Sequence, residues 1–405
     1  MQPTEKLYFN DSSVLEFDAN VLEIKPADQG YRVVLDSTAF YPTGGGQPND
    51  TGSLGDARVI DVVEDESGII YHVVEDAASL TEDSTVTAKI DADRRLDHMQ
   101  QHSGQHILSQ AFIQTCGAET RSFHLGPRTS TIDIELQSPT DALIRAAEEI
   151  ANAVVFEDRP MRVHMVTDEQ ASKLPLRKES AVQGAIRVIE IEDFDWSPCG
   201  GTHAARTGQV GLIAVRSYER AKKMTRVEFI CGHRALEDYR LAHSTAVRVA
   251  RCFSAERDSS PELVAKALEE NKELKKRMRD LMELAITAEA SRAVAAALPA
   301  RGFKLIHAVF DRRDLDEVRM LASKIVETEP AIALLATRQA DGVRLVFARS
   351  TSLSEDMGKL MAEACEMLGG RGGGRPNLAQ GGAPSAQYID QAIQSAADKV
   401  SGASV

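Results

Sequence analysis

Two short segments far apart in the chain carry side chains that could do metal chemistry. HMQQHSGQH places His102 and His106 four residues apart, and SPCGGTH places Cys199 and His203 four residues apart. Residues at i and i+4 lie on one face of a helix, so both imidazoles of the first pair could reach one ion. Imidazole and thiolate ligands suit Zn²⁺ better than Mg²⁺ or Ca²⁺. The sequence therefore predicts a zinc site formed by these four residues.

Each pair taken alone also has an ordinary structural interpretation. Two histidines on one helical face often hydrogen-bond or line a core, and His98 repeats the same spacing outside the predicted set. A single cysteine such as Cys199 is often a small buried hydrophobic residue. The two pairs together favour a metal, although the lack of a glutamate between His102 and His106 excludes the HExxH pattern of zinc proteases. The spacing leaves open whether three or four side chains bind the ion.

The length and composition of the chain are those of a multidomain globular protein. A chain of 405 residues is longer than a single hydrophobic core usually accommodates, so we expect two to four domains. The formal net charge of −14 argues against a general nucleic-acid binder, although a local basic surface would suffice for phosphate contacts. The five cysteines are few and widely spaced, which is typical of reduced thiols and not of a disulfide framework. We find neither a secretory signal nor an apolar run of membrane-spanning length. We therefore expect a cytoplasmic protein without a membrane segment.

The patterning predicts an α+β multidomain fold with four successive regions. Residues 1–92 contain five short β-branched runs between turn signals, which predict a small N-terminal β-barrel. Residues 93–233 alternate helix and strand patterns and predict an α+β domain that contains the zinc site. Residues 234–299 predict an antiparallel helical hairpin acting as a stalk, with an intermolecular coiled coil as the alternative. Residues 300–405 predict a C-terminal α/β domain.

Two glycine-rich segments and one basic segment interrupt these patterns. FYPTGGGQPNDTGSL, in the first region, is expected to be a flexible loop or a place where the backbone approaches another group closely. GGRGGGRPNLAQGGA, in the last, is no dinucleotide fingerprint because Arg375 stands where the final glycine would be, and it lacks the GK[ST] of a P-loop. Residues 216–234 contain six basic and two acidic residues, which alone is typical of a solvated face.

Taken together, these motifs resemble those of a known protein family. HMQQHSGQHILSQAF, SPCGGTHAARTGQVG and ERAKKMTRVEFICG are similar to the editing domain of alanyl-tRNA synthetases and of their free-standing relatives, the AlaX-type alanyl-tRNA editing proteins. FYPTGGGQPNDTGSL resembles the glycine-rich motif of the β-barrel that precedes that domain. GGRGGGRPNLAQGGA resembles the signature of the C-terminal domain in the synthetases and in long AlaX proteins. The resemblance covers nearly the whole chain, and the stalk matches by pattern only.

The resemblance implies hydrolysis of the ester between a wrong amino acid and tRNA(Ala). The implied substrates are tRNA(Ala) mischarged chiefly with serine and secondly with glycine, and the activity would act in trans because no synthetase core is expected before the barrel. In the family, HxxxH and CxxxH bind the metal, which maps the catalytic and metal-binding roles onto His102, His106, Cys199 and His203. A zinc ion can lower the pKa of water to near 7 and polarise an ester carbonyl, but only if a coordination position stays open.

Further residues are implied by the same resemblance. Serine differs from alanine by a hydroxyl, which a hydrogen-bonding pocket can select. HSGQH replaces the HTATH of many synthetases, so the role of their middle threonine is not carried over to Gln105, for which a helix-surface position is the alternative. The expected substrate-binding residues are Thr43, Gly44, Gly45, Gly46, Gln47 and Gln105. The expected tRNA-binding residues are Arg216, Arg220, Lys222, Lys223, Arg226, Arg371 and Arg375.

Other functions are also compatible with these motifs. A non-catalytic tRNA-binding protein would use all four ligands for a structural zinc, and a related deacylase would act on another mischarged tRNA. A phosphoesterase is the third alternative, because a similar C-terminal domain accompanies DHH-type phosphoesterases, but the chain has no Asp-His-His motif. A homodimer through the helical stalk or the C-terminal domain is a further expectation.

Overall fold

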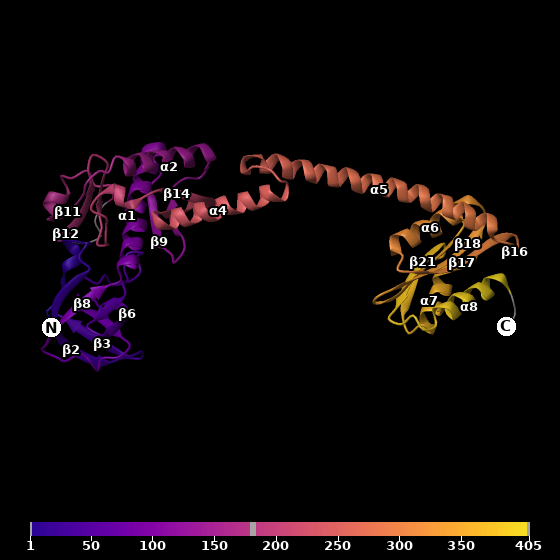
Figure 1. The fold of residues 1–405 in the computed structure, drawn as a ribbon, viewed down its shortest axis with the longest axis horizontal. Coiled ribbons are helices and arrows are strands. Elements are labelled where there is room, and N and C mark those ends of the chain that lie inside the picture. Colours follow the sequence, from indigo (N-terminus) through magenta and orange to yellow (C-terminus); the bar gives the residue numbers. More distant parts are fainter. Residues whose placement is uncertain (1, 179–183, 403–405) are drawn as a thin grey trace. The chain divides into compact units, whose positions relative to one another are not determined.

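The fold divides into two compact units. The computed structural model describes residues 2–178 and 184–402, and the packing groups the chain into Met1–Arg251 and Cys252–Val405. Each unit has its own sheets and helices (Figure 1). The chain is thus mixed α+β and multidomain, with eight α-helices in its described part. None of the helices described is long and apolar enough to cross a lipid bilayer.

The first unit begins with a closed six-stranded β-barrel. Around the barrel its strands are β2 (Glu16–Pro26), β3 (Tyr31–Leu35), β7 (Ile70–Val74), β6 (Ala57–Glu64), β5 (Gly52–Leu54) and β8 (Thr85–Ile90). Alternate β-branched side chains fill its interior, such as Val33, Val59 and Val62. The short strand β5 lies in the glycine-rich segment and pairs with both β6 and β8, so it closes the barrel. Before the barrel, β1 (Glu5–Lys6) pairs with β4 (Ser37–Thr38), and the 3-10 turn η1 (Leu7–Phe9) follows β1.

Helix α1 (Ala92–Cys116) carries the HxxxH motif through the middle of the first unit. It begins where the Asp91 side chain accepts a hydrogen bond from the backbone of Arg94, and it ends at Gly117 in the left-handed conformation. Most of its middle is buried, polar residues included, so other elements surround it on several sides. Gly104 permits this packing, because a Cβ there would lie 2.2 Å from Cys231 Sγ.

Two sheets and several helices complete the first unit around α1. One sheet has the order β14 (Ile213–Ala221), β15 (Met224–Cys231), β10 (Ser130–Ile134) and β9 (Thr120–Leu125). The other has the order β11 (Met161–Val166), β12 (Ile186–Ile191) and β13 (Asp195–Pro198). The helices are α2 (Asp141–Phe156), α3 (Asp168–Ala171), the 3-10 turn η2 (Thr207–Val210) and α4 (His233–Cys252). Apolar residues of α1, α2 and both sheets share one core, which fixes α1 against the strands that precede the CxxxH loop.

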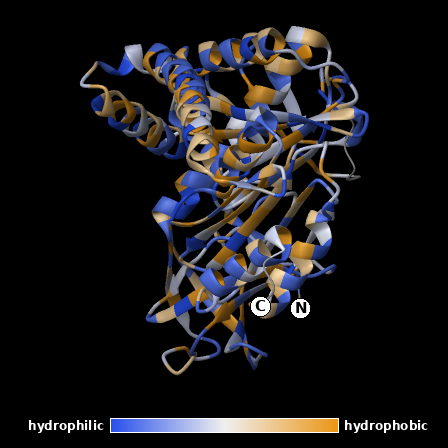
Figure 2. Ribbon diagram, turned by 90° about the vertical axis from the view of Figure 1, so that its right-hand side faces the viewer, coloured by the Kyte–Doolittle hydropathy of each residue, from blue (hydrophilic) through white to orange (hydrophobic). Residues whose placement is uncertain are grey.

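The second unit is an α/β layer structure. Its sheet has the order β16 (Pro299–Ala300), β17 (Phe303–Asp311), β18 (Ala331–Gln339), β19 (Gly342–Arg349), β21 (Leu378–Ala383) and β20 (Arg371–Arg375). Its helices are the 3-10 turn η3 (Arg257–Ser259), α5 (Ser260–Ala296), α6 (Leu315–Thr328), α7 (Met357–Met367) and α8 (Ile389–Ser401). Alternate residues of β18 pack against α5 and α6 on one face and against α7 and α8 on the other. Figure 2 shows the hydrophobic residues that run along the strands and the mixed polarity of the helices.

Candidate metal centre

The four predicted metal ligands lie together in the first unit. His102 and His106 project from α1, and Cys199 and His203 lie in the loop after β13. The donor atoms of all four lie within 4.8 Å of one another. Cys199 Sγ is 3.3 Å from Nε2 of His102 and 3.3 Å from Nε2 of His203. The residues that the structure describes contain no second such group of donors, and His98 is outside this one.

The loop with Cys199 reaches α1 because its backbone is held close to the helix. Arg187 of β12 donates from Nη1 to the carbonyl oxygens of Cys199 and Gly201 at 2.8 and 2.9 Å. Its Nε donates to the carbonyl oxygen of Phe9 at 2.9 Å. Gly201 lies directly against His102, since a Cβ at this position would be 2.2 Å from the ring carbon Cε1. Glycine at 201 therefore allows the close approach on which the cluster depends.

Each imidazole turns its Nδ1 atom toward a polar group outside the cluster. His102 Nδ1 lies 2.7 Å from Gln47 Oε1, and His203 Nδ1 lies 3.2 Å from Ser103 Oγ. His106 Nδ1 lies 3.6 Å from Asp195 Oδ2 and has no hydrogen-bond partner within the described residues. Such outer partners orient metal-binding histidines so that the other nitrogen faces the ion. The arrangement leaves the Nε2 atoms of His102 and His203 directed at Cys199.

The charge balance of the cluster also suits a cation. Burial raises the pKa of the Cys199 thiol, but the interactions with His102 and His106 lower it by more, so the net pKa lies well below the usual 9.0. Burial lowers the pKa of His203 to about 3, so its imidazole is neutral at pH 7. Thiolate and neutral imidazole are the forms of these side chains that bind metals. Behind the cluster, Asp195 accepts from Arg177 Nε and from Ser197 Oγ, both at 2.9 Å. The donors could hold a metal ion.

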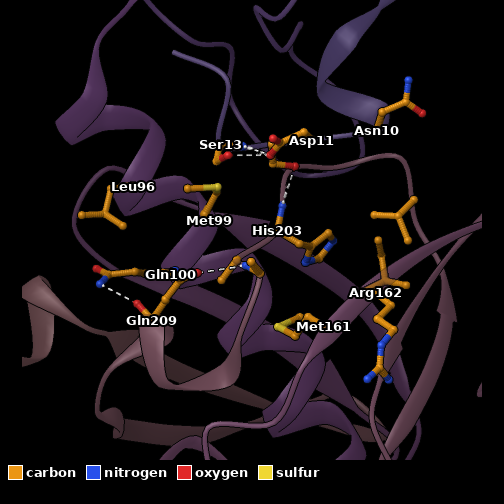
Figure 3. Close-up of a pocket in the computed structure, with 15 residues that line it drawn as sticks. Asn10, Asp11, Ser13, Leu96, Met99, Gln100, Met161, Arg162, His203 and Gln209 are labelled. Carbon is orange, nitrogen blue, oxygen red and sulfur yellow. Dashed lines mark hydrogen bonds between the residues drawn. The ribbon is translucent and has the colours of Figure 1, made fainter.

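Two cavities adjoin the cluster, and they share different members of it. A cavity of about 270 Å³ is lined by His102, His106 and Cys199, together with Gly45, Gln105 and residues of β9. A larger cavity of about 700 Å³ shares only His203 with the cluster and has Met99 and Met161 in its wall (Figure 3). The smaller cavity exposes three of the four donors to one space. It is therefore the candidate reaction site.

The glycine-rich loop contributes to this site in three different ways. Gly44 and Gln47 exchange backbone hydrogen bonds across a tight turn, and Gly45 lines the smaller cavity. Gly46 packs on β9, because a Cβ there would lie 2.6 Å from the carbonyl oxygen of Phe123. Thr43 is exposed outside the cavity lining, and its Oγ1 accepts from the backbone of Asn49 at 3.0 Å. The expected loop thus connects β4 to β5 and contacts α1 through Gln47 and β9 through Gly46.

The two expected glutamines occupy different positions. Gln105 lines the smaller cavity, and its Nε2 donates to Ser109 Oγ at 2.8 Å. Thr120 of β9 also lines the cavity and donates to the same Ser109 oxygen at 2.7 Å. Gln47 is absent from the lining of this cavity and lies behind His102. Gln105 is a buried cavity residue and does not have the helix-surface position that was its alternative.

The basic residues expected to bind tRNA are all exposed, but two of them form ion pairs with nearby carboxylates. Arg226 binds both carboxylate oxygens of Asp133 at 2.8 and 2.9 Å, and Arg216 forms ion pairs with Asp238 and Glu228. The exposed residues at the turn between β14 and β15 are Arg220, Lys222 and Lys223. In the second unit, Arg371 and Arg375 are exposed at the two ends of β20, which pairs with β21. Some of the backbone amide and carbonyl groups near these arginines therefore form hydrogen bonds within the sheet.

Several polar residues at the centre were not expected from the sequence. They are Ser12, Ser103, Arg177, Arg187, Asp195 and Thr202. Asp195 stands four positions before Cys199, but Glu190, Glu192 and Asp193 precede it, so the local sequence does not single it out. Ser103 and Thr202 are sequence neighbours of His102 and His203, but the contacts observed here span 100 and 155 residues, and that of Ser12 spans 191. Spacing alone could therefore not have identified these contacts.

Models of known protein families match three segments of the chain. The family model for the threonyl and alanyl tRNA synthetase second additional domain matches residues 186–228. The model for class II (A) tRNA synthetases matches residues 4–94, and the DHHA1 domain model matches residues 302–402.

Individual relatives cover nearly all of the chain. It is 29% identical to the alanyl-tRNA editing protein AlaX-L of Pyrococcus horikoshii, over 93% of this chain and 94% of the relative. It is 30% identical to the alanine–tRNA ligase of Halorubrum lacusprofundi and 28% identical to that of Pyrococcus abyssi, over 98% and 97% of this chain. The chain spans only 44% and 43% of the length of these ligases. The similarity predicted from the sequence motifs is confirmed.

Proposed function

From its resemblance to AlaX-type editing proteins and to the editing and C-terminal parts of alanyl-tRNA synthetase, we propose that this chain is a zinc-dependent aminoacyl-tRNA deacylase. It would hydrolyse tRNA(Ala) mischarged chiefly with serine and secondly with glycine, in trans and in the cytoplasm. One observation carries the proposal: His102, His106, Cys199 and His203 converge, and three of them line one cavity.

Zinc is the ion that this donor set fits best. Three imidazole nitrogens and one thiolate, each within reach of one point, match the borderline-soft preference of Zn²⁺. When bound, zinc supplies a positive charge that polarises an ester carbonyl and activates water at neutral pH. The protein holds the proton of His102 on Nδ1 against Gln47, so that Nε2 stays free for the ion. Asp195 Oδ2 lies 3.6 Å from Nδ1 of His106, close enough for a charge interaction but beyond hydrogen-bond distance.

The smaller cavity would receive the aminoacyl end of the tRNA. Its lining combines the ring of Phe123 with the polar groups of Gln105 and Thr120, which share Ser109 as a hydrogen-bond partner. Because Gln105 Nε2 already donates to Ser109, a seryl hydroxyl could donate to Gln105 Oε1. An alanyl group could not make this hydrogen bond, which gives discrimination. Thr43 is the weaker candidate for this contact because its hydroxyl already bonds Asn49.

Phosphates of the tRNA would contact two groups of exposed basic residues. In the first unit these are Arg220, Lys222 and Lys223, with Lys178 at the smaller cavity. In the second unit they are Arg371 and Arg375. Arg216 and Arg226 are weaker candidates, because each would have to exchange a carboxylate partner for a phosphate. A homodimer through α5 or the rest of the second unit is part of the proposal.

The test is a panel of mischarged tRNAs with matched cysteine variants. Zinc-loaded protein should hydrolyse Ser-tRNA(Ala) and, more slowly, Gly-tRNA(Ala), and should spare Ala-tRNA(Ala). Cys199→Ala and His106→Ala should lower the rate by about 1000-fold or more while leaving tRNA affinity within about 2-fold. Cys116→Ala is the control, since Cys116 lies at the far end of α1 and bonds only Phe112 there. Full turnover by Cys199→Ala would refute the proposal.

A structural zinc in a tRNA-binding protein is the second candidate function. It is favoured by the presence of four donors within 4.8 Å, because four protein ligands normally close a zinc site. The same panel separates the candidates. Zinc bound at one equivalent with no turnover on any mischarged tRNA would favour the binding protein. Turnover on a tRNA other than tRNA(Ala) would keep the deacylase and change its substrate.

A further inference from the structure

The glycine-rich loop of the barrel reaches the candidate metal centre through the buried side chain of Gln47. It is 1% exposed, and its Oε1 lies 2.7 Å from His102 Nδ1. Because an amide oxygen only accepts hydrogen bonds, the contact requires the proton of His102 on Nδ1. Nε2 of His102 then carries a free lone pair, and it points at Cys199 Sγ 3.3 Å away.

The same amide also contacts the loop that carries the other two donors. Gln47 Nε2 donates to Thr202 Oγ1 at 2.9 Å, and the backbone N–H of Thr202 donates to Gln47 Oε1 at 3.3 Å. Thr202 stands between Gly201, which touches the ring of His102, and the ligand His203. Gln47 therefore links the helix donors to the loop donors at the point where the two segments meet.

We propose that Gln47 is a positioning residue for His102 and that the barrel, which supplies no metal ligand, completes the metal centre through it. The inference rests on the proposed metal centre and replaces the expected substrate-binding role of Gln47. Its amide oxygen and nitrogen are both engaged within the protein, and it does not line the smaller cavity. Among the described barrel residues, it alone forms a side-chain hydrogen bond to a donor imidazole.

Neighbouring contacts explain how the barrel holds this position. The turn that closes Gly44 on Gln47 and the packing of Gly46 on Phe123 fix the backbone of the loop. On the other side, Ser12 Oγ accepts from the backbone N–H of His203 at 3.2 Å. The barrel side thus contacts both metal-binding segments, His102 through Gln47 and His203 through Ser12.

The experiment measures zinc affinity in the full-length protein without tRNA. Zinc is titrated against a chromophoric chelator, and cobalt spectra check that the thiolate of Cys199 still binds. Gln47→Met, which keeps the shape but removes the acceptor, should weaken zinc binding by about 10- to 100-fold. Gln47→Glu keeps an acceptor at Nδ1 and should bind zinc within about 3-fold of the parent or more tightly. Thr202→Val removes the Nε2 contact but leaves the one to His102, and should change the affinity by less than about 3-fold.

The outcomes separate orientation of His102 from general packing. Unchanged zinc affinity in Gln47→Met overturns the inference, and so does an equal loss in Gln47→Met and Gln47→Glu, because only packing would then be at stake. If Gln47→Met does not fold, Gln47→Asn takes its place, since the shorter side chain withdraws its oxygen from Nδ1. Parent protein that binds zinc through Cys199 but hydrolyses no mischarged tRNA would end the proposed function and leave this inference intact.

Discussion

Residues 44–46 and residues 372–374 are both runs of three glycines, one in each unit of the chain. In the first run, Gly45 and Gly46 have φ angles of +56° and +85°, so the chain turns sharply and returns toward α1. In the second run the backbone is extended and forms β20 beside β21. A Cβ at Gly372 would lie 2.7 Å from Cys365 Sγ, whereas a Cβ at Gly373 would meet nothing within 4 Å.

The two runs contain glycine for two separate physical reasons. In the first run it permits a backbone conformation that other residues rarely adopt. In the second run it permits close packing of helix α7 on an extended strand, with no special φ angle. A run of three glycines by itself therefore predicts neither a loop nor a strand, because the neighbouring elements decide its conformation.

The largest difference is expected between Gly46→Ala and Gly373→Ala. At position 46 the new Cβ would combine a left-handed φ with an approach of 2.6 Å to the Phe123 carbonyl, so the first unit should lose about 3 kcal/mol of unfolding free energy. At position 373 the Cβ enters open space, and the second unit should be unchanged or stabilised by up to about 1 kcal/mol. Urea unfolding followed separately for each unit by hydrogen exchange measures both. Equal effects would show that the two runs do not differ as described.

The sequence predicted the donors better than it predicted their surroundings. Helical spacing puts His102 and His106 on one face, and the CxxxH pair supplied the matching chemistry. Because His98 has the same spacing, the family resemblance was needed to leave it out of the set. The contact of Gln47 with His102 could not be predicted, because it spans 55 residues and depends on how the barrel packs on α1. Asp195 was missed for a related reason: its partner His106 lies on another element.

The same distinction between local and distant information holds for the fold. Five short β-branched runs predicted the barrel strands β2, β3, β6, β7 and β8. The sixth strand, β5, has only three residues and begins with glycine, so pairing with its neighbours decides its conformation. The hairpin of β20 and β21 is similar, since its glycines have low strand propensity and become a strand by pairing with β19 through β21.

A smaller effect is expected within the metal-binding loop, where adjacent glycines differ. Gly201→Ala would place a Cβ 2.2 Å from His102 Cε1, so the loop must retreat, and zinc affinity should fall by about 10- to 100-fold. Gly200→Ala meets nothing within 4 Å and should leave the affinity within about 2-fold. Chelator competition on the two variants side by side measures this. A loss of affinity in Gly200→Ala as large as in its neighbour would mean that loop flexibility, and not contact with His102, sets the affinity.

The smallest expected effect is a loss of stability at acidic pH. It compares a buried histidine of the first unit with the exposed histidine of the second. His72 is buried in the barrel, where it contacts Thr38 Oγ1 at 2.8 Å and the carbonyl oxygen of Val33 at 3.1 Å. Burial lowers its pKa from 6.5 to about 4. The only histidine of the second unit, His307, is exposed. While His72 is neutral in both the folded and the unfolded chain, its protonation does not affect stability. Once the pH is low enough for His72 to bind a proton in the unfolded chain only, the unfolded chain is favoured and the free energy of unfolding falls.

The sign of the acid effect follows from the two pKa values. Above pH 6.5 neither state is protonated at His72, so its stabilising effect is complete; it declines as the pH falls from 6.5 toward 4. Between pH 7.5 and pH 5.5 the barrel of the metal-free protein should lose about 1.3 kcal/mol through this residue. Hydrogen exchange of β3 and β7 measures the loss, with β18 of the second unit as the internal reference. In His72→Gln this part of the pH dependence should disappear, whatever the variant costs at neutral pH. A barrel that keeps its full acid sensitivity without His72 would assign the effect to another buried group, of which His98, with a pKa also lowered to about 4 by burial, is the first to examine.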